Sequence, residues 1–290
     1  MSEQKNLPIP LKYRPLKFSE LIGQSLMSQT IQKAIQTDRI ANAYLLTGVR
    51  GVGKTTTARI IAKSLNCMNI DSNDEKEPCG VCENCIAITE SRSVDVYEMD
   101  AASRTGIADI RELIEGVQYS PVSSKYKVYI IDEVHMLSTA AFNGLLKTLE
   151  EPPPHVKFIF ATTEIRKVPI TILSRCQRFD LQRVLSDKLI EHLKWVCDQE
   201  NIKSSLEALQ IIARVSGGSV RDALSLLDQS ASISSDDIKS ETISFMLGLP
   251  SRVSSIEVLE KTLKGDVSEA LNLYDTIINS GSNSETMISD

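Results

Sequence analysis

The stretch LLTGVRGVGKTTTARI, residues 45–60, constrains the fold more than any other part of the chain. It reads as an apolar strand, a glycine-rich turn and a helix, and Gly48 to Thr55 match the pattern G-x-x-x-x-G-K-[ST]. Glycines allow backbone angles that turn successive N–H groups onto phosphate oxygens, and the positive end of the following helix lies at the same place. The stretch therefore predicts a phosphate-binding loop for a nucleotide.

We expect this loop to bind ATP. Lys54 would reach the β- and γ-phosphates, and the hydroxyl of Thr55 would bind Mg²⁺. The alternative, a glycine-rich turn with a chance lysine, leaves the preceding strand and the following helix unexplained. The residues expected to contact the nucleotide here are Gly48, Val49, Arg50, Gly51, Val52, Gly53, Lys54, Thr55 and Thr56.

A second motif, VYIIDEVH, places two carboxylates at the end of an apolar strand. Ligands of open α/β sheets bind at the carboxyl ends of the strands. Asp132 is therefore expected to hold Mg²⁺ beside the phosphate loop. Glu133 is then placed to polarise an attacking water as a general base. The alternative is a solvated acidic pair, which the intact phosphate loop disfavours.

Strands and helices alternate along the first 184 residues. Strands are expected at 43–47, 94–99, 126–132, 156–162 and 176–181. Helices are expected at 54–66, at 107–118 and from a Ser138 cap to Glu151, where three prolines follow. This order predicts an α/β fold with a doubly wound parallel sheet covered by helices.

After residue 184 the pattern becomes helical, and we expect three parts in the chain. They are a nucleotide-binding core at 1–184, a small all-α domain at 185–247 and the start of a further helical domain at 248–290. The helices expected in the last two parts are 186–200, 205–216, 219–231, 235–247, 252–264 and 267–280. No internal repeat or low-complexity segment was found in the sequence.

Four of the six cysteines lie close together with the spacing C-x11-C-x2-C-x2-C. In a reducing compartment such a cluster indicates a metal site rather than disulfides. Four sulfur ligands with no open position are typical of structural zinc. We expect zinc on Cys67, Cys79, Cys82 and Cys85, within a module at about 67–85. The alternative is four free thiols.

Further polar residues follow the fourth strand and open a later helix. Thr163, after the strand, is placed to sense a phosphate or to orient water, and Arg175 stands in the motif SRC. Arg221 lies in the first turns of an expected helix, where the helix dipole does not favour a cation, so an anionic partner is plausible. The alternative for each arginine is a surface salt bridge.

Composition limits the classes of partner and place. The chain has 290 residues and a net charge of −6. A free-standing DNA-binding protein usually has a basic surface, so any contact with nucleic acid must come from a local patch within an assembly. No apolar run is long enough to span a bilayer and the first ten residues contain no secretory leader, so the cytoplasm is expected.

Together these pieces resemble the AAA+ clamp-loader ATPases, within them the gamma/tau branch of bacterial DNA polymerase III. The resemblance covers most of residues 10–230, in the family's order. The stretches that carry it are KYRP at 12–15, GVRGVGKTT at 48–56, the four-cysteine insert, DAASRTG at 100–106, IIDEVHML at 130–137, LLKTLEEPP at 145–153, TILSRCQRF at 171–179 and GGSVRDAL at 217–224.

The resemblance implies an ATP-driven motor of DNA replication, with an AAA+ core, a zinc insert, a helical lid and part of a helical collar. It implies that Thr163 is sensor 1, that Arg221 is sensor 2 and that Arg175 reaches the ATP of a neighbouring subunit in trans. Tyr13, Arg14 and Pro15 match the stretch that packs near adenine. Arg104, Lys147 and Thr171 match positions that face the DNA backbone.

The partners implied are the delta and delta-prime subunits, other gamma/tau copies, the beta sliding clamp and primer–template DNA, without a membrane. In this picture ATP binding lets a five-membered spiral open the clamp, and hydrolysis releases it closed around DNA. The long first cysteine spacer departs from the family pattern. The stretch after GLPS departs from it as well, because its roughly forty residues predict a short or truncated collar.

Two other readings were weighed. Asp132 to His135 spell a DExH box, but a helicase of that kind needs a second sheet domain that the helical C-terminal half does not predict. A scaffold subunit that binds ATP without hydrolysing it, or fails to assemble, is the second reading. The intact set of Lys54, Thr55, Asp132 and Glu133 argues against it, whereas the short collar keeps it open.

Overall fold

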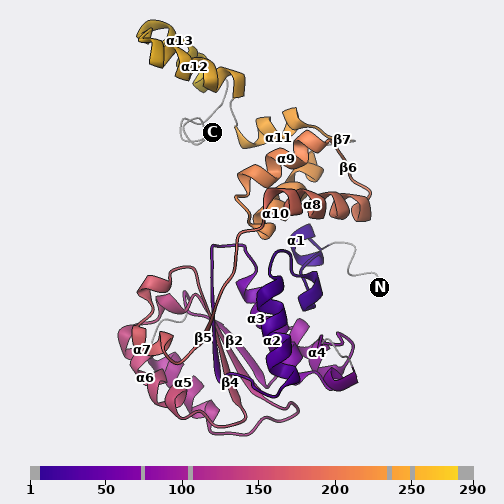
Figure 1. Ribbon diagram of the computed structural model, residues 1–290, viewed down its shortest axis with the longest axis vertical. Coiled ribbons are helices and arrows are strands. Elements are labelled where there is room, and N and C mark those ends of the chain that lie inside the picture. Colours follow the sequence, from indigo (N-terminus) through magenta and orange to yellow (C-terminus); the bar gives the residue numbers. More distant parts are fainter. Residues whose placement is uncertain (1–6, 73–75, 104–106, 234–236, 249–251, 280–290) are drawn as a thin grey trace. The chain divides into compact units, whose positions relative to one another are not determined.

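The computed structural model describes residues 7–72, 76–103, 107–233, 237–248 and 252–279 (Figure 1). Its main sheet has five parallel strands in the order β2-β3-β4-β1-β5. The strands are β1 (Ala43–Thr47), β2 (Val96–Asp100), β3 (Lys127–Asp132), β4 (Val156–Thr162) and β5 (Gln177–Asp180). The predicted parallel α/β sheet is therefore confirmed.

The central strands are apolar because both faces of the sheet are covered. Every residue of β1 and β4 is buried, whereas most positions of the edge strands β2 and β5 are exposed. Parallel sheets with helices on both faces require such continuous apolar runs. One face packs against α5 (Ile107–Val117) and α6 (Thr139–Glu150), and the other against α2 (Ser25–Gln36) and α3 (Lys54–Asn66).

The strand register brings polar side chains to one edge of the sheet. Thr47 at the end of β1 is paired with Thr162 of β4 on one side and with Asp180 of β5 on the other. Asp100 at the end of β2 is paired with Asp132 of β3. The phosphate loop follows Thr47, so all these residues lie at the carboxyl edge where ligands of such sheets bind.

Short elements complete this part of the chain. They are α1 (Ile9–Lys12), α4 (Glu83–Thr89), α7 (Ile170–Leu173) and 3-10 turns at Phe18–Glu20, Ile70–Ser72, Val134–Met136 and Ile165–Lys167. The sequence did not predict α2 or α4. The predicted Ser138 cap is present, because its side chain accepts the backbone N–H of Ala141.

The chain divides into two compact units, each with its own contacts. One contains Leu11–Lys188 together with Gly218–Arg221, and the other contains Met1–Pro10, Leu189–Gly217 and Asp222–Asp290. The elements after the main sheet are α8 (Ser186–Glu200), β6 (Lys203–Ser204), α9 (Leu206–Val215), α10 (Val220–Ile233), β7 (Asp237–Ile238), α11 (Ser240–Leu247), α12 (Arg252–Lys264) and α13 (Val267–Asn279). The boundaries predicted at 184–185 and 247–248 stay a prediction.

One predicted helix, 235–247, was wrong at its start. Asp237 and Ile238 form a strand that pairs in parallel with Lys203 and Ser204. The backbone N–H of Ser205 donates to Ile238 O at 3.0 Å, and the Ile238 side chain is buried. Residues 235 and 236 of the predicted helix lie outside the described residues. Asp237 and Ile238 form a strand instead of a helix, and α11 begins only at Ser240.

Candidate functional site

The glycine-rich loop leaves the carboxyl end of β1 in backbone conformations that favour glycine. Gly48, Gly51 and Gly53 have φ values of 147°, 74° and 104°. A Cβ at Gly48 would also lie only 2.8 Å from the backbone oxygen of Leu181. Gly53 is the N-cap of α3, which begins at Lys54. The loop therefore leads directly into the positive end of a helix, where anions bind.

The Lys54 side chain is buried and bends back over this loop. Its Nζ donates to the backbone oxygens of Gly48 and Val49, each at 3.1 Å. Burial lowers the pKa of Lys54, while the negative charges of Glu133 and Asp132 oppose that shift. A phosphate oxygen is a stronger partner for an ammonium group than a neutral carbonyl. The arrangement therefore suits Lys54 to exchange these carbonyls for a bound phosphate.

Thr55 and Asp132 meet between α3 and the end of β3. Thr55 Oγ1 donates a hydrogen bond to Asp132 Oδ2. The other carboxylate oxygen accepts the backbone N–H of Glu133 at 2.9 Å. Hydroxyl and carboxylate oxygens are hard ligands, and Mg²⁺ is usually held by one or two such groups together with waters and substrate phosphates. These two residues therefore fit a magnesium ion beside the phosphate loop.

Glu133 lies at the end of β3 with an unusual backbone conformation. Its φ of 47° is in the left-handed region, which few residues other than glycine adopt. Its Oε2 accepts the backbone N–H of Thr163 at 3.1 Å and the hydroxyl of Thr163 at 2.9 Å. The structure thus brings together the residue predicted as general base and the residue predicted as sensor.

His135 belongs to the same cluster, although the sequence analysis gave it no role. Its Nδ1 lies 2.9 Å from Thr162 Oγ1 and 3.4 Å from Glu133 Oε2. Its Nε2 lies 3.5 Å from Glu164 Oε1. The side chain is only 6% exposed, so these polar groups are its main surroundings. The sequence signal that could have indicated a role for His135 is its position two residues after Glu133.

In the KYRP stretch, the Arg14 side chain contacts α3, the helix that follows the phosphate loop. Arg14 Nε donates to Thr56 Oγ1 at 3.0 Å. Burial lowers the pKa of Arg14, and the positive charge of Arg59 acts in the same direction. Tyr13 and Pro15 flank this residue and are half-buried. This stretch therefore lies against the first turn of α3, next to the phosphate loop.

Arg221 also reaches the phosphate loop through its backbone. Its N–H donates to Gly51 O at 3.3 Å, and Gly218–Arg221 belong to the same compact unit as the loop. Gly218, three residues earlier, packs closely on the chain that follows β5, because a Cβ there would lie 2.9 Å from the backbone oxygen of Val184. The structure therefore places the predicted sensor 2 residue in the first turn of α10, beside the loop.

The structure holds Arg175 elsewhere, between α6 and α7. Its guanidinium pairs with Glu150, and Nη1 donates to Thr171 O at 2.7 Å and to Ser174 Oγ at 3.2 Å. Lys147 lies one turn before Glu150 on α6, and Lys147 and Thr171 are both exposed. Lys147 on α6 and Thr171 on α7 therefore lie on neighbouring helices, and Arg175 follows the end of α7. The third predicted DNA contact, Arg104, lies outside the described residues.

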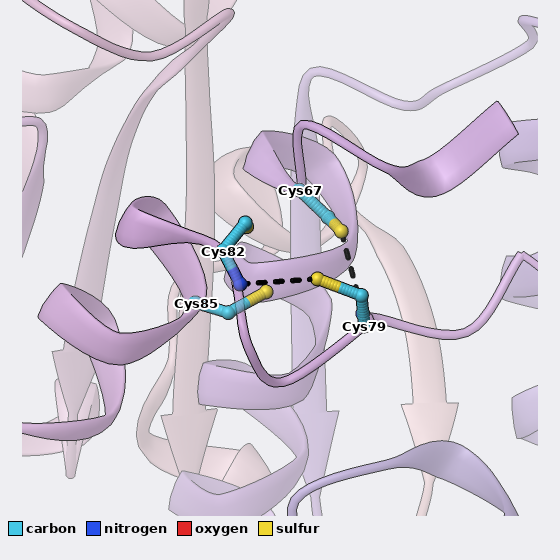
Figure 2. Close-up of side chains that lie close together, drawn as sticks. All are labelled: Cys67, Cys79, Cys82 and Cys85. Carbon is cyan, nitrogen blue, oxygen red and sulfur yellow. Dashed lines mark hydrogen bonds between the residues drawn. The ribbon is translucent and has the colours of Figure 1, made fainter. Parts of the chain in front are cut away.

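The four cysteines of the insert converge as Figure 2 shows. Cys67 is the C-cap of α3, Cys82 is the N-cap of α4 and Cys85 lies within α4. All four sulfur atoms lie within 4.8 Å of one another. Zinc–sulfur distances of about 2.3 Å in a tetrahedron place the sulfur atoms about 3.8 Å apart, which is compatible with that limit. The cluster, including Cys67 with its long spacer, therefore fits a zinc ion.

Hydrogen bonds to sulfur support the same conclusion. The backbone N–H of Cys79 donates to Cys67 Sγ, and that of Cys82 donates to Cys79 Sγ, both at 3.3 Å. Burial raises the pKa of Cys67 and Cys85. It acts in the same direction on Cys79, but the N–H groups of Val81 and Cys82 and further hydrogen bonds outweigh it and lower the pKa of Cys79 to about 6. A thiolate is the form that binds metal. Zinc held here would fix the loop between α3 and α4.

Among the described residues, no helix combines the length and the apolar character that crossing a bilayer would require.

Two protein-family models match the chain. One, described as "DNA polymerase III, delta subunit", matches residues 23–185. The other, described as "DNA polymerase III clamp loader subunit, ATPase lid domain", matches residues 188–236. The second match supports the prediction of a small helical lid after the core. Neither match extends to α12 and α13, so the predicted collar rests on the resemblance alone.

Curated relatives align with nearly the whole chain. The DNA polymerase III subunit gamma/tau of Mycoplasma genitalium is 45% identical over 94% of this chain, and the subunit tau of Escherichia coli is 43% identical over 90% of it. The chain spans only 45% and 40% of those relatives. The DNA polymerase III subunit gamma of Buchnera aphidicola subsp. Acyrthosiphon pisum is 42% identical, over 93% of this chain and 74% of that relative.

The fold is also similar to solved structures. The Holliday junction branch migration motor RuvB of Thermotoga maritima superimposes with a TM-score of 0.59 over 86% of this chain and 78% of that one. The identity is 18%, so this likeness concerns the AAA+ ATPase fold alone.

Proposed function

Since this chain belongs to the DNA polymerase III gamma/tau family of AAA+ clamp-loader ATPases, we propose that it is an ATP-hydrolysing motor subunit of the clamp loader. Its work would be to load the beta sliding clamp onto primed DNA during replication, as part of the DNA polymerase III holoenzyme. The observation that carries the proposal is the convergence of Lys54, Thr55, Asp132, Glu133 and Thr163 at one edge of the sheet.

Each member of this set has a role in the proposal. Lys54 and the backbone of the phosphate loop bind the phosphates of ATP, and Thr55 and Asp132 hold Mg²⁺. Magnesium would neutralise charge on the β- and γ-phosphates. Glu133 accepts a proton from the attacking water, and Thr163 senses the γ-phosphate and positions Glu133. Transfer to water releases ADP and phosphate.

The arginines act on the same reaction from two places. Arg221, beside Gly51, would contact the phosphates of the subunit's own ATP as sensor 2. Arg175 would reach the ATP of a neighbouring gamma/tau copy, where an arginine in trans contributes roughly 10³–10⁵ in rate. Its contacts with Glu150 and Thr171 support this role, because they hold the guanidinium on α6 and α7 rather than at its own loop.

The remaining predicted residues would contact the adenine base and the DNA. Tyr13, Arg14 and Pro15 would line the adenine end of the site, next to Thr56. Lys147 and Thr171 would contact DNA phosphates, together with Arg104. Several subunits, each contributing a few such contacts, would allow a chain with net charge −6 to hold DNA.

The assembly is proposed on the same basis. Delta, delta-prime and further gamma/tau copies would surround the DNA in the cytoplasm, and the helices α12 and α13 would begin the collar that joins them. These two helices pack against each other, and Ile256, Leu259 and Leu263 of α12 are exposed, which supports a further apolar partner. Zinc would have a structural role in this assembly.

Steady-state ATP hydrolysis by the chain, mixed with delta, delta-prime, beta clamp and primed DNA, tests the proposal. We expect stimulation by clamp and DNA, and its loss in Lys54→Ala and in Arg175→Ala. Lys33→Ala, an exposed lysine on α2, is the matched control and should keep the stimulated rate. A flat low rate, also seen with a chain extended through the collar, would instead support a scaffold subunit that does not hydrolyse ATP.

A further inference from the structure

Glu77 joins the cysteine loop to the N-terminal segment of the same unit. Its side chain is buried and lies two residues before Cys79. Oε2 accepts the backbone N–H of Phe18 at 2.9 Å, and Oε1 accepts that of Ser19 at 3.0 Å. Gln32 of α2 also donates to Oε1, at 3.0 Å. One carboxylate of the metal loop thus receives three donors from elements much earlier in the chain.

These contacts link the position of Glu77, beside Cys79, to the position of Phe18 and Ser19 in the N-terminal segment. A buried carboxylate is costly unless donors surround it, so Glu77 is stable here only while Phe18 and Ser19 keep their places. Conversely, the 3-10 turn Phe18–Glu20 begins with two N–H groups that Glu77 satisfies from outside the turn. Displacement of residues 76–79, which include both Glu77 and Cys79, would therefore release the start of this turn.

A second contact fixes the same segment from α3. Lys63 is 2% exposed, and its Nζ donates to Leu16 O at 2.9 Å. Lys63 lies in the last turn of α3, one turn before Cys67. At the other end of the segment, Arg14 contacts Thr56 beside the phosphate loop. Residues 14–20 therefore connect the first turn of α3 with the metal loop that follows its last turn.

We propose that Glu77 is a positioning residue that couples metal binding at the four cysteines to nucleotide binding. Metal fixes the loop, the loop fixes Glu77, and Glu77 fixes the segment that presents Tyr13, Arg14 and Pro15 to the nucleotide. The inference rests on the proposed function for its nucleotide half. Coupling between two sites is reciprocal, so bound nucleotide must also strengthen metal binding by the same factor.

The first test is independent of nucleotide. Amide hydrogen exchange at Phe18 and Ser19 is compared in the zinc-loaded chain, the metal-stripped chain and zinc-loaded Glu77→Gln. We expect exchange to become faster, to a similar extent, after metal removal and in the variant. Glu90→Gln, an exposed glutamate at the end of α4, is the matched control and should exchange as wild type. Unchanged exchange in the metal-stripped chain would overturn the proposal.

The second test measures the dissociation constant of a fluorescent ADP. We expect roughly five- to tenfold weaker binding in metal-stripped wild type and in zinc-loaded Glu77→Gln, in the range of typical coupling. Metal removal should weaken binding to Glu77→Gln no further, because both changes break the same link. Effects that multiply, or a Glu77→Gln chain with wild-type affinity, would overturn the coupling.

A second variant and a measurement of zinc affinity complete the test of the coupling. If Glu77→Gln does not fold, Gln32→Leu removes one of the three donors and should give smaller changes of the same sign in both tests. Equilibrium zinc affinity, measured with a competing chelator, should rise with saturating ADP in wild type and stay constant in the variant. Wild type that binds no ADP would refute the proposed function, while the exchange test would still decide whether metal orders the segment.

Discussion

Glu133 and Thr163 are joined by two hydrogen bonds, because one carboxylate oxygen of Glu133 accepts both the backbone N–H and the hydroxyl of Thr163. The pair links the ends of the neighbouring strands β3 and β4. A γ-phosphate that attracts the Thr163 hydroxyl would compete with Glu133 for it. Loss of that donor would free the carboxylate to accept a proton from water. In the proposed mechanism, the contact would therefore connect phosphate sensing by Thr163 with general-base catalysis by Glu133.

Glu133→Gln should separate binding from hydrolysis. The amide keeps the shape of the side chain but is a far weaker base, so we expect the rate of ATP hydrolysis to fall by about 10²–10⁴. The dissociation constant for fluorescent ATP should change little, because Lys54 and the loop remain. Glu112→Gln, on the exposed side of α5, is the control. A variant that retains its rate would remove Glu133 from the mechanism.

Gly48→Ala and Gly53→Ala should differ in their cost to stability. Both positions have positive φ, which costs roughly 1–3 kcal/mol for a residue with a side chain. A Cβ at Gly48 also meets the Leu181 carbonyl at 2.8 Å, whereas a Cβ at Gly53 meets no atom within 4 Å. Thermal unfolding should therefore show the larger loss for Gly48→Ala. An equal loss would mean that the backbone conformation alone decides.

Asp95→Asn should give a pH-dependent loss of stability. Asp95 is buried, and burial raises its pKa, but the backbone N–H groups of Val122, Ser123 and Ser124 outweigh this and lower it. A lowered pKa in the folded state means that the stabilisation is complete above the unfolded value of about 3.9 and is lost as pH falls through the folded value.

For Asp95→Asn, urea unfolding at pH 7 should show a free energy of unfolding lower by about 1–3 kcal/mol. The difference from wild type should narrow below about pH 4, where the Asp95 carboxylate of the unfolded wild-type chain becomes protonated while that of the folded chain still resists protonation. Asp38→Asn, at an exposed position with positive φ, should stay within a few tenths of a kcal/mol of wild type. A difference that does not depend on pH would show that the charge is unimportant.

Lys147→Ala should reduce the salt dependence of DNA binding by the assembled complex. Each phosphate contact that is lost lowers the slope of log K against log salt by about 0.9. Fluorescence anisotropy of primed DNA over a salt series gives the slope. Lys33→Ala removes the same charge from α2 and should leave the slope unchanged. Equal effects of the two variants would show that only net charge matters.

The predicted sheet was confirmed because its strands carry a strong signal. The residues of β1 and β4 are mostly apolar, and both strands are buried on two faces. The short strand at Asp237–Ile238 could not be predicted in this way. Its stability comes from a partner more than thirty residues earlier, Lys203–Ser204, and local periodicity contains no information on that pairing.

The candidate site was predictable where a sequence motif specifies both the reactive side chain and its place in the fold. Lys54, Thr55 and Asp132 follow from the phosphate loop and from a strand end, and the structure brings them together. Glu77 was not predictable, because it stands in a polar stretch that reads as a loop. Its burial and its hydrogen bonds with Phe18 and Ser19 become visible only in the structure. The roles assigned to all site residues stay predictions.

Helix α3 starts with Lys54 and is capped at its other end by Cys67, so its length sets the distance between the phosphate loop and the cysteine cluster. Each residue advances a helix by about 1.5 Å and turns it by about 100°. Inserting or deleting one residue in α3 would leave the phosphate loop intact but rotate Cys67 away from the other three sulfur atoms. The number of residues between the two sites is thus fixed by both angle and length, because a change of about one whole turn would restore the angle but move Cys67 by about 5.4 Å along the helix axis.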